Sequence, residues 1–208
     1  MTRAKPKWNG EFDAVASIQT AKRRMLLREA AAGFNERGFH NVSLDEVAAR
    51  LGITKAVCYY YFRDKNDLLR SCIEIGFELA EQALKVGEGT RGSGLDKVVA
   101  MTRSYVEGLT SELGACAVVG DLNSLQDDDL KVVRQRQRAF GRRLEKMVQR
   151  GMDDGSIDVD DARATASWIV SAPLMIPRLA GLWQKGGIDA LADKYAGLAR
   201  RALERRAA

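Results

Sequence analysis

Two short helical segments on either side of Gly52 constrain this chain more than any other feature. Ser43 precedes the first segment and stands three residues before Glu46, which is the spacing of a capping box. The apolar residues of that segment recur at helical spacing, at Leu44, Val47, Ala48 and Leu51. Gly52 suits a left-handed turn, and Thr54 is a candidate N-cap for the second segment. The pattern predicts a helix-turn-helix over residues 43–62.

Helical spacing continues along the rest of the chain, so the predicted fold class is all α. Only three prolines and 7% aromatic residues argue against a β-sandwich, which needs frequent turns and aromatic strands. The glycine-rich segment 86–94 is the clearest linker-like break. Pro173 and Pro177 are expected to kink or split an apolar helical region over 158–183. A flexible basic arm is expected over residues 1–16.

The net charge of +5 is concentrated at one end of the chain. Residues 1–70 hold 13 lysines and arginines against 8 acidic residues, whereas the remainder holds 20 of each. A basic segment joined to a neutral one favours a polyanion as the partner of the first segment. On charge alone, a solvated basic surface without a partner is an equally good interpretation.

The inventory of reactive side chains argues against an enzyme. The chain has one histidine, His40, and three cysteines without a CxxC pair. This count disfavours a Ser-His-Asp triad, a histidine metal cluster and a structural zinc site, so no catalytic residue, metal or cofactor is expected. No segment predicts a membrane span or a signal peptide, and a cytoplasmic location is expected.

The second helix of the motif should present a compact exposed face of a cation, a small residue and two phenols, made of Lys55, Ala56, Tyr59 and Tyr60. A face of this kind suits the major groove of DNA. Tyr61 and Phe62 are expected to pack in the core, and Cys58 is expected to be a small buried residue.

The run from Gly52 to Leu69, together with Ala30 to Ser43, resembles the DNA-binding domain of the TetR (tetracycline repressor) family. The resemblance covers about residues 17–79. Two positions depart from the family pattern, Ala56 where glycine is frequent and Tyr61 where histidine is frequent. The resemblance implies DNA-contacting roles for the residues of the exposed face and for three flanking ones, which together are Ser43, Thr54, Lys55, Ala56, Tyr59, Tyr60 and Lys65.

The same resemblance implies that residues 80–208 form a helical domain that dimerises and binds a small effector. The two last helical regions, 160–183 and 188–206, are the apolar pair best suited to a four-helix dimer interface. Large side chains on neighbouring helices are candidates to line a largely apolar effector cavity, namely Met101, Tyr105, Phe140, Leu144, Trp168 and Met175. The alternative for these six residues is an ordinary core.

The leading functional hypothesis is a homodimeric regulator, most often a repressor in this family, that binds a palindromic operator in double-stranded DNA and is released by a small effector. Two alternatives remain open at this point. The chain could be a helical small-molecule-binding protein, or an architectural DNA-binding protein without sequence preference.

Overall fold

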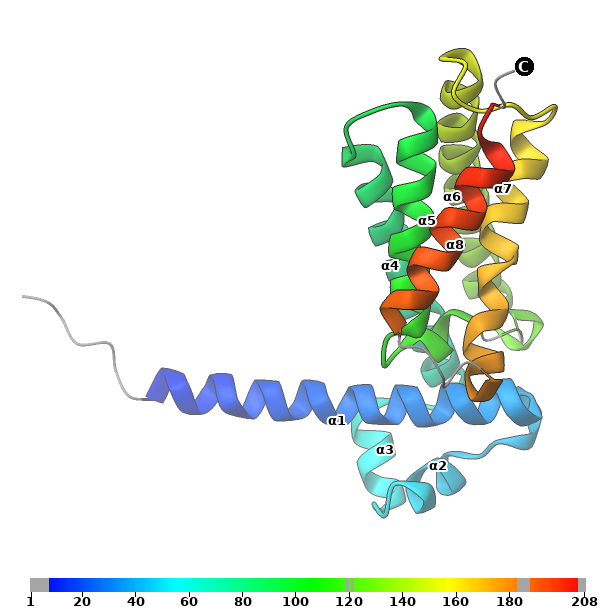
Figure 1. Cartoon of the computed structure of the whole chain (residues 1–208). Coiled ribbons are helices and arrows are strands. Elements are labelled where there is room, and N and C mark those ends of the chain that lie inside the picture. The colour runs from blue at the N-terminus through cyan, green and yellow to red at the C-terminus, as the bar shows by residue number, and fades with distance from the viewer. Residues whose placement is uncertain (1–7, 119, 121, 183–187, 206–208) are drawn as a thin grey trace, which may run out of the picture.

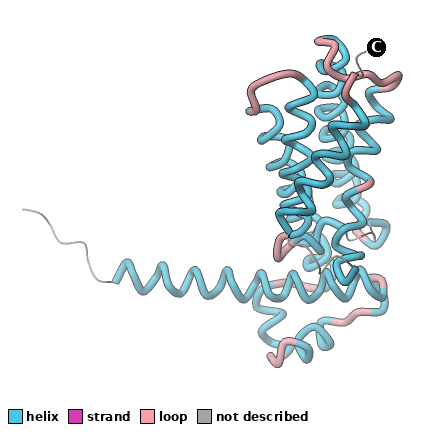
Figure 2. The backbone as a smooth tube through the Cα atoms, viewed as in Figure 1, coloured by secondary structure: helices cyan, strands magenta, loops and turns pink. Residues whose placement is uncertain are grey.

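The computed structural model describes residues 8–118, 120, 122–182 and 188–205. Within these residues the chain is helical, with one isolated β-bridge between Ile157 and Glu204, so the all-α prediction is confirmed (Figure 2). None of the described helices is both long and apolar enough to cross a lipid bilayer. The elements in chain order are α1 (Trp8–Arg37), η1 (Phe39–Asn41), α2 (Leu44–Arg50), α3 (Lys55–Tyr61), α4 (Lys65–Gly89), α5 (Gly94–Thr110), η2 (Gly114–Val118), η3 (Leu122–Ser124), α6 (Asp127–Asp153), α7 (Ala162–Ser171), η4 (Pro173–Leu182) and α8 (Ile188–Leu203).

Helix α1 lies across the foot of an upright bundle of α4 to α8, with α2 and α3 on its far side (Figure 1). The expected arm over residues 1–16 is wrong from Trp8 onward, because α1 already begins there. Pro6 is the last proline before this helix, and no proline lies within the helix itself. Extending an existing helix by one residue costs far less than starting a new one, so α1 continues back to Trp8. Residues 1–7, which include all the basic residues of the arm, lie outside the described residues.

The first core joins α1, α2 and α3 to the start of α4. The helical stripe on α1 is buried as its spacing predicts, and it packs with the first turns of α4. The buried residues from these two helices include Leu26, Leu27, Ala30, Phe34, Leu68, Leu69 and Cys72. This packing fixes the position of α2 and α3, which are too short to be stable alone.

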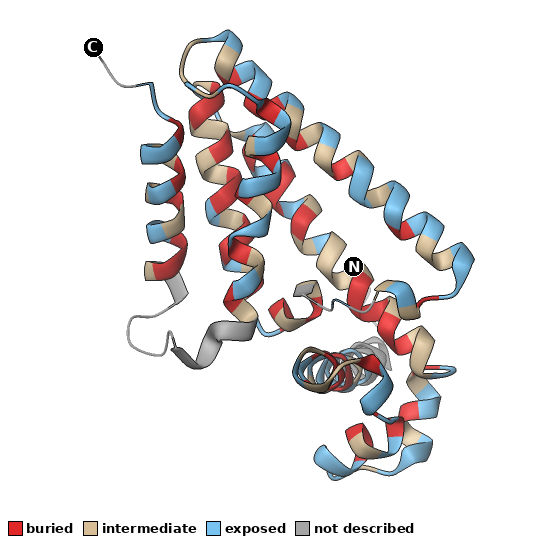
Figure 3. Ribbon diagram, turned by 90° about the vertical axis from the view of Figure 1, so that its right-hand side faces the viewer, coloured by how far each residue is buried: buried red, intermediate tan, exposed pale blue. Residues whose placement is uncertain are grey.

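The second core lies inside the upright bundle, where the buried residues of the helices lie mainly on their inward sides (Figure 3). Helix α4 contributes to both cores, with residues up to Ile73 in the first and residues from Ala80 in the second. The domain boundary between residues 79 and 80 stays a prediction, and α4 runs through it as one continuous helix.

The glycine-rich segment is not a linker. Helix α4 continues to Gly89, and only a tight turn separates it from α5. In that turn Gly92 has a φ of 117°, and the Ser93 and Asp96 side chains form a reciprocal capping box at the start of α5. A Cβ on Gly94 would lie 2.3 Å from the Cα of Gly151, so this glycine allows α5 to cross the end of α6 closely.

The prolines divide the last apolar region as predicted. Helix α7 ends at Ser171, and the chain continues from Pro173 as the tighter helix η4. A third small core then joins η4 and α8 to α5 through Val106, Ile176, Leu191 and Ala192.

Candidate functional site

The turn between α2 and α3 is built by local contacts that the sequence predicts. The Ser43 hydroxyl accepts a hydrogen bond from the Glu46 amide at 3.1 Å, while the Glu46 carboxylate pairs with Arg37 and Arg50 instead of completing a capping box. Gly52 has a φ of 65°, which only glycine adopts freely, and the next residue, Ile53, donates its amide to the carbonyl of Ala48 at 3.0 Å. Local contacts therefore set the turn between α2 and α3, in addition to the packing of both helices on α1 and α4.

Helix α3 exposes two stripes of side chains. Lys55 and Tyr59, four residues apart, form one stripe, and the Lys55 ammonium lies 5.7 Å from the centre of the Tyr59 ring. Ala56 and Tyr60 form the other, and Tyr60 is 69% exposed. Such large exposed rings on a seven-residue helix leave much surface for a partner.

Four of the predicted DNA-contacting residues surround one shallow hollow of about 390 Å³, namely Ser43, Lys55, Tyr59 and Lys65. The other three, Thr54, Ala56 and Tyr60, are exposed beside it. Thr54 occupies the N-cap position of α3 without a capping hydrogen bond from its side chain. Lys65 is held in place, because its ammonium donates to the His40 carbonyl at 3.3 Å and lies 4.2 Å from the centre of the Phe39 ring.

Asp45 is a residue of this site that the sequence analysis missed. Its carboxylate lies 2.9 Å from the Lys55 ammonium, and this hydrogen bond raises the pKa of Lys55. The pair connects α2 to α3 across the turn. Asp45 and Lys55 are ten residues apart in sequence, so their pairing cannot be predicted without the geometry of the turn.

The core assignments on α3 are mostly confirmed. Phe62 is 1% exposed and Cys58 is fully buried, with its thiol 3.8 Å from the Leu44 carbonyl. Tyr61 is half-buried, at the edge of the core. His40 also has a side-chain contact, since its Nε2 lies 3.2 Å from the hydroxyl of Ser124 on η3.

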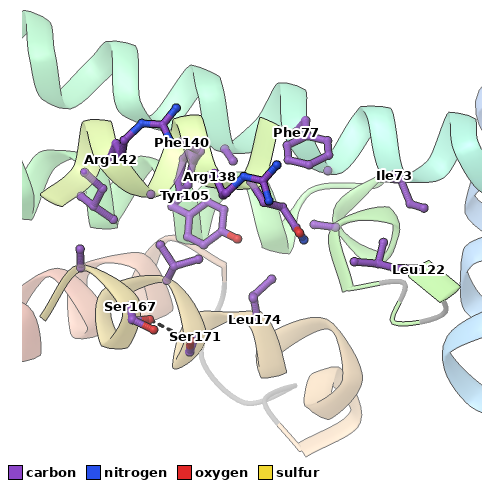
Figure 4. A pocket seen from close by; sticks show the side chains of 18 of the residues that line it. Ile73, Phe77, Tyr105, Leu122, Arg138, Phe140, Arg142, Ser167, Ser171 and Leu174 are labelled. Atoms are coloured by element: carbon purple, nitrogen blue, oxygen red, sulfur yellow. Dashed lines mark hydrogen bonds between the residues drawn. The ribbon is translucent and has the colours of Figure 1, made fainter. Parts of the chain in front are cut away.

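A second site lies inside the upright bundle, in a cavity of about 860 Å³ between α4, α5, α6, α7 and η4 (Figure 4). Of the six residues predicted to line it, Tyr105, Phe140, Leu144 and Met175 do so. The prediction is wrong for Met101 and Trp168. Met101 is buried in the α4–α5 contact beside Gly87, and Trp168 points outward from α7 with 46% of its surface exposed.

The cavity also has polar lining that the sequence analysis missed. Arg138 and Arg142 come from α6, and Arg163, Ser167 and Ser171 come from α7. The arginines of α6 lie within a run of charged residues that is typical of a solvated helix face, so the sequence does not distinguish them as cavity residues. Among the described residues, no three His, Cys, Asp or Glu side chains lie close enough together to hold a metal ion.

Comparison with known proteins assigns both parts of the chain. Residues 26–72 match the model of bacterial regulatory proteins of the tetR family, and residues 91–203 match a tetracyclin repressor-like C-terminal domain. A curated relative, the HTH-type transcriptional regulator BetI of Pectobacterium carotovorum, is 29% identical over 87 residues, which cover 39% of this chain and 45% of the relative. The BetI protein of Yersinia pestis is 32% identical over 68 residues, which cover 33% of this chain and 34% of the relative. The match thus spans less than half the length of these curated relatives.

Solved structures share the fold over most of the chain. The ketosteroid transcriptional regulator KstR2 of Mycobacterium tuberculosis is 15% identical with a TM-score of 0.74, covering 89% of this chain and 96% of that one. AibR in complex with isovaleryl coenzyme A and operator DNA is 21% identical with a TM-score of 0.69, covering 85% and 96%. Because the model of the C-terminal domain matches more than half of the residues of this chain, the chain belongs to the TetR family of bacterial regulatory proteins.

Proposed function

We propose that this protein is a sequence-specific DNA-binding regulator that binds a palindromic operator as a homodimer and is released by a small effector. The observation that carries the proposal is the hollow beside α3, where Ser43, Lys55, Tyr59 and Lys65 converge. Two ammonium groups and two hydroxyl groups there suit phosphate oxygens, which fix a protein's register on the duplex. The chain belongs to a family of regulatory proteins, which supports a regulatory role over a catalytic one.

The base-reading role falls to α3. Lys55 reaches base edges or phosphates, and the rings of Tyr59 and Tyr60 contact phosphates or a thymine methyl group. Ala56 adds a small apolar contact, and the Thr54 hydroxyl donates a hydrogen bond to a phosphate oxygen. We place the DNA-binding domain over residues 17–79 and the effector-binding and dimerisation domain over residues 80–208.

Asp45 competes with DNA for Lys55, because its carboxylate holds the ammonium and repels phosphates. We expect Asp45→Asn to strengthen binding to every duplex several-fold at low salt, since one negative charge per protomer leaves the interface. Fluorescence anisotropy with labelled DNA measures this. Asp128→Asn is the matched control, because Asp128 is also exposed and paired with a lysine, Lys131, but lies on α6. Unchanged or weaker binding by Asp45→Asn would place Lys55 away from the DNA.

Dimerisation is supported by large apolar side chains left exposed on α7 and α8. Trp168 of α7 is 46% exposed and Leu198 of α8 is 51% exposed, whereas Met175 of η4, also 46% exposed, lines the cavity. Exposed apolar groups mark a protein–protein interface where they gather on one face of the molecule. Two recognition helices on a two-fold axis would read half-sites about one helical turn, or a multiple of it, apart.

We expect the double substitution Trp168→Glu and Leu198→Glu to convert the dimer to a monomer, because two charges per protomer would be buried without partners. Light scattering coupled to size-exclusion chromatography gives the mass. Val132→Glu on α6 is the control, since Val132 is 55% exposed and lies on another helix. A dimeric double variant would assign the interface to a different surface.

Coupling between the two sites is supported by the connection between α5 and α6. Cys116 and Leu122 of this connection line the cavity, while the Ala115 carbonyl accepts a hydrogen bond from Asn35 of α1 at 2.7 Å. An effector that binds one arrangement of this connection better than another would shift the position of α1 and with it α3. AibR has been solved with both isovaleryl coenzyme A and operator DNA, which supports this pairing of ligands for the fold.

Selection of bound duplexes from a random DNA library, repeated at two salt concentrations, tests the proposal. An enriched palindrome with two half-sites would support a dimeric sequence-specific regulator. Binding without an enriched sequence, lost steeply with salt, would favour an architectural DNA-binding protein. If no duplex is bound, the alternative of a helical small-molecule-binding protein becomes the better one.

A further inference from the structure

The cavity has an apolar interior. Hydrocarbon groups line it from three elements, with Phe77 and Ala80 on α4, Phe140 and Leu144 on α6 and Leu174 on η4. Its volume of about 860 Å³ lies within the range of pockets that enclose most of a small-molecule ligand. The interior alone would accept any apolar body of suitable length.

Tyr105 adds one polar group to this interior. Its side chain comes from α5, is only 3% exposed, and points its hydroxyl into the cavity (Figure 4). No described residue forms a hydrogen bond with this hydroxyl. Burial raises the pKa of Tyr105, so the phenol keeps its proton and acts as a donor. A ligand that fills the cavity would cover this hydroxyl, and a covered donor costs free energy unless it is hydrogen-bonded, so its position favours an oxygen acceptor on the ligand.

The rim of the cavity is positively charged. Arg138 and Arg142 line it from α6, Arg163 lines it from α7, and Glu145 is the one carboxylate among its described lining residues. None of these three arginines forms an ion pair within the described part of the chain. Arg143, next to Arg142 in sequence, differs in this respect, because Glu81 and Glu88 of α4 both hold its guanidinium.

We propose that the ligand of this cavity is an anionic amphiphile. Its hydrocarbon part would lie against Phe140 and Leu144, an oxygen would accept a hydrogen bond from Tyr105, and a carboxylate or phosphate would bind Arg138 and Arg142. Guanidinium groups bind both anions with paired hydrogen bonds. A wholly apolar ligand would leave the donor inside and the cations at the rim without partners. This inference rests on the proposed function only in taking the cavity as the effector site.

Three probes with the same ten-carbon chain test the charge requirement by isothermal titration calorimetry on the full-length protein. Decanoate carries a carboxylate, decanoyl-coenzyme A carries phosphates, and 1-decanol is neutral. We expect both anions to bind at least tenfold more tightly than decanol at low salt, with a smaller difference at high salt. A much tighter coenzyme A ester would identify phosphate as the anion, whereas equal affinities would show that one carboxylate is sufficient.

Variants then locate the interaction. The double substitution Arg138→Gln and Arg142→Gln should remove the preference for anions and leave decanol binding unchanged. Arg134→Gln is the matched control, because Arg134 lies one turn before Arg138 on α6, is exposed, and does not line the cavity. Tyr105→Phe, which keeps the ring, should weaken all three probes about fivefold by removing one donor.

Equal binding of decanol and decanoate, binding of no probe, or an unchanged preference in the double arginine variant would each overturn the inference. These failures are separate from a failure of the proposed function. A protein that selects an operator but shows no preference for anions loses only the ligand class. A protein that binds the anions through Arg138 and Arg142 but selects no DNA keeps the ligand site and loses the regulatory function.

Discussion

Replacing Lys55 and Tyr59 together by alanine is expected to weaken operator binding by at least about 100-fold. Each protomer loses one cation and one ring from the stripe that borders the hollow, and a dimer loses both twice. One good side-chain contact to DNA contributes about 1–3 kcal/mol, so four lost contacts exceed two orders of magnitude even at the low end of that range. Titration of the selected operator by fluorescence anisotropy measures the change.

The fold of this double variant should be unchanged, because both side chains are about half exposed on the surface of α3. The exposed pair between Lys55 and Asp45 contributes at most about 1 kcal/mol to stability. Lys85→Ala is the control, since Lys85 is an exposed lysine of α4 away from the hollow. The salt dependence of binding should fall for the double variant and not for the control. Full operator affinity in the double variant would remove α3 from the interface.

The parts of the structure that the sequence predicts are those fixed by nearby residues. Gly52 turns the chain as its type requires, and Ser43 caps the next helix through an atom three residues away. Pro173 ends α7 because its ring cannot continue the helix. The stripe on α1 from Leu26 to Phe34 is buried because periodicity alone places it on one face.

The parts that it does not predict depend on contacts between distant elements. Segment 86–94 has the composition of a flexible linker, yet its Gly94 is needed where α5 crosses α6 beside Gly151. Met175 lines the cavity whereas Trp168 does not, and one helical period carried through residues 158–183 does not anticipate this, because the chain changes from α7 to η4 between them. The pairing of Asp45 with Lys55 follows from the turn angle, which no local pattern gives.

The arginines of the cavity that lack an ion pair among the described residues have no signature in the sequence. On α6, Arg142 and Arg143 are neighbours of the same type, yet one faces the cavity rim and the other is held by two glutamates of α4. Successive residues on a helix point about 100° apart, so which one is paired depends on how α6 packs against α4. Sequence shows a basic run, whereas packing decides which of its charges are available to a ligand.

Replacing Phe62 by alanine is expected to lower the free energy of unfolding by about 3–5 kcal/mol, the usual cost of removing a buried phenylalanine ring. Phe62 is 1% exposed, lies in the core shared by α1 and α4, and has the Arg23 guanidinium 5.2 Å from its ring centre. Its amide also closes the last turn of α3 at 2.9 Å from the Cys58 carbonyl, so the ring anchors this helix where the chain leaves it. Urea denaturation followed by circular dichroism measures the change.

Tyr61→Ala is the matched control for that prediction, because Tyr61 is the adjacent aromatic residue and is only half-buried. It should cost clearly less stability than Phe62→Ala. The Phe62 variant should also lose operator binding, but for a different reason than the Lys55 and Tyr59 double variant, since here α3 loses its support instead of its contacts. Loss of binding together with a lowered unfolding midpoint would show that α3 has lost its support. Loss of binding with an unchanged midpoint would show that only contacts with DNA are lost. If Phe62→Ala unfolds at the wild-type midpoint, this ring does not anchor α3, and the position of the recognition helix must depend on the turn at Gly52 alone.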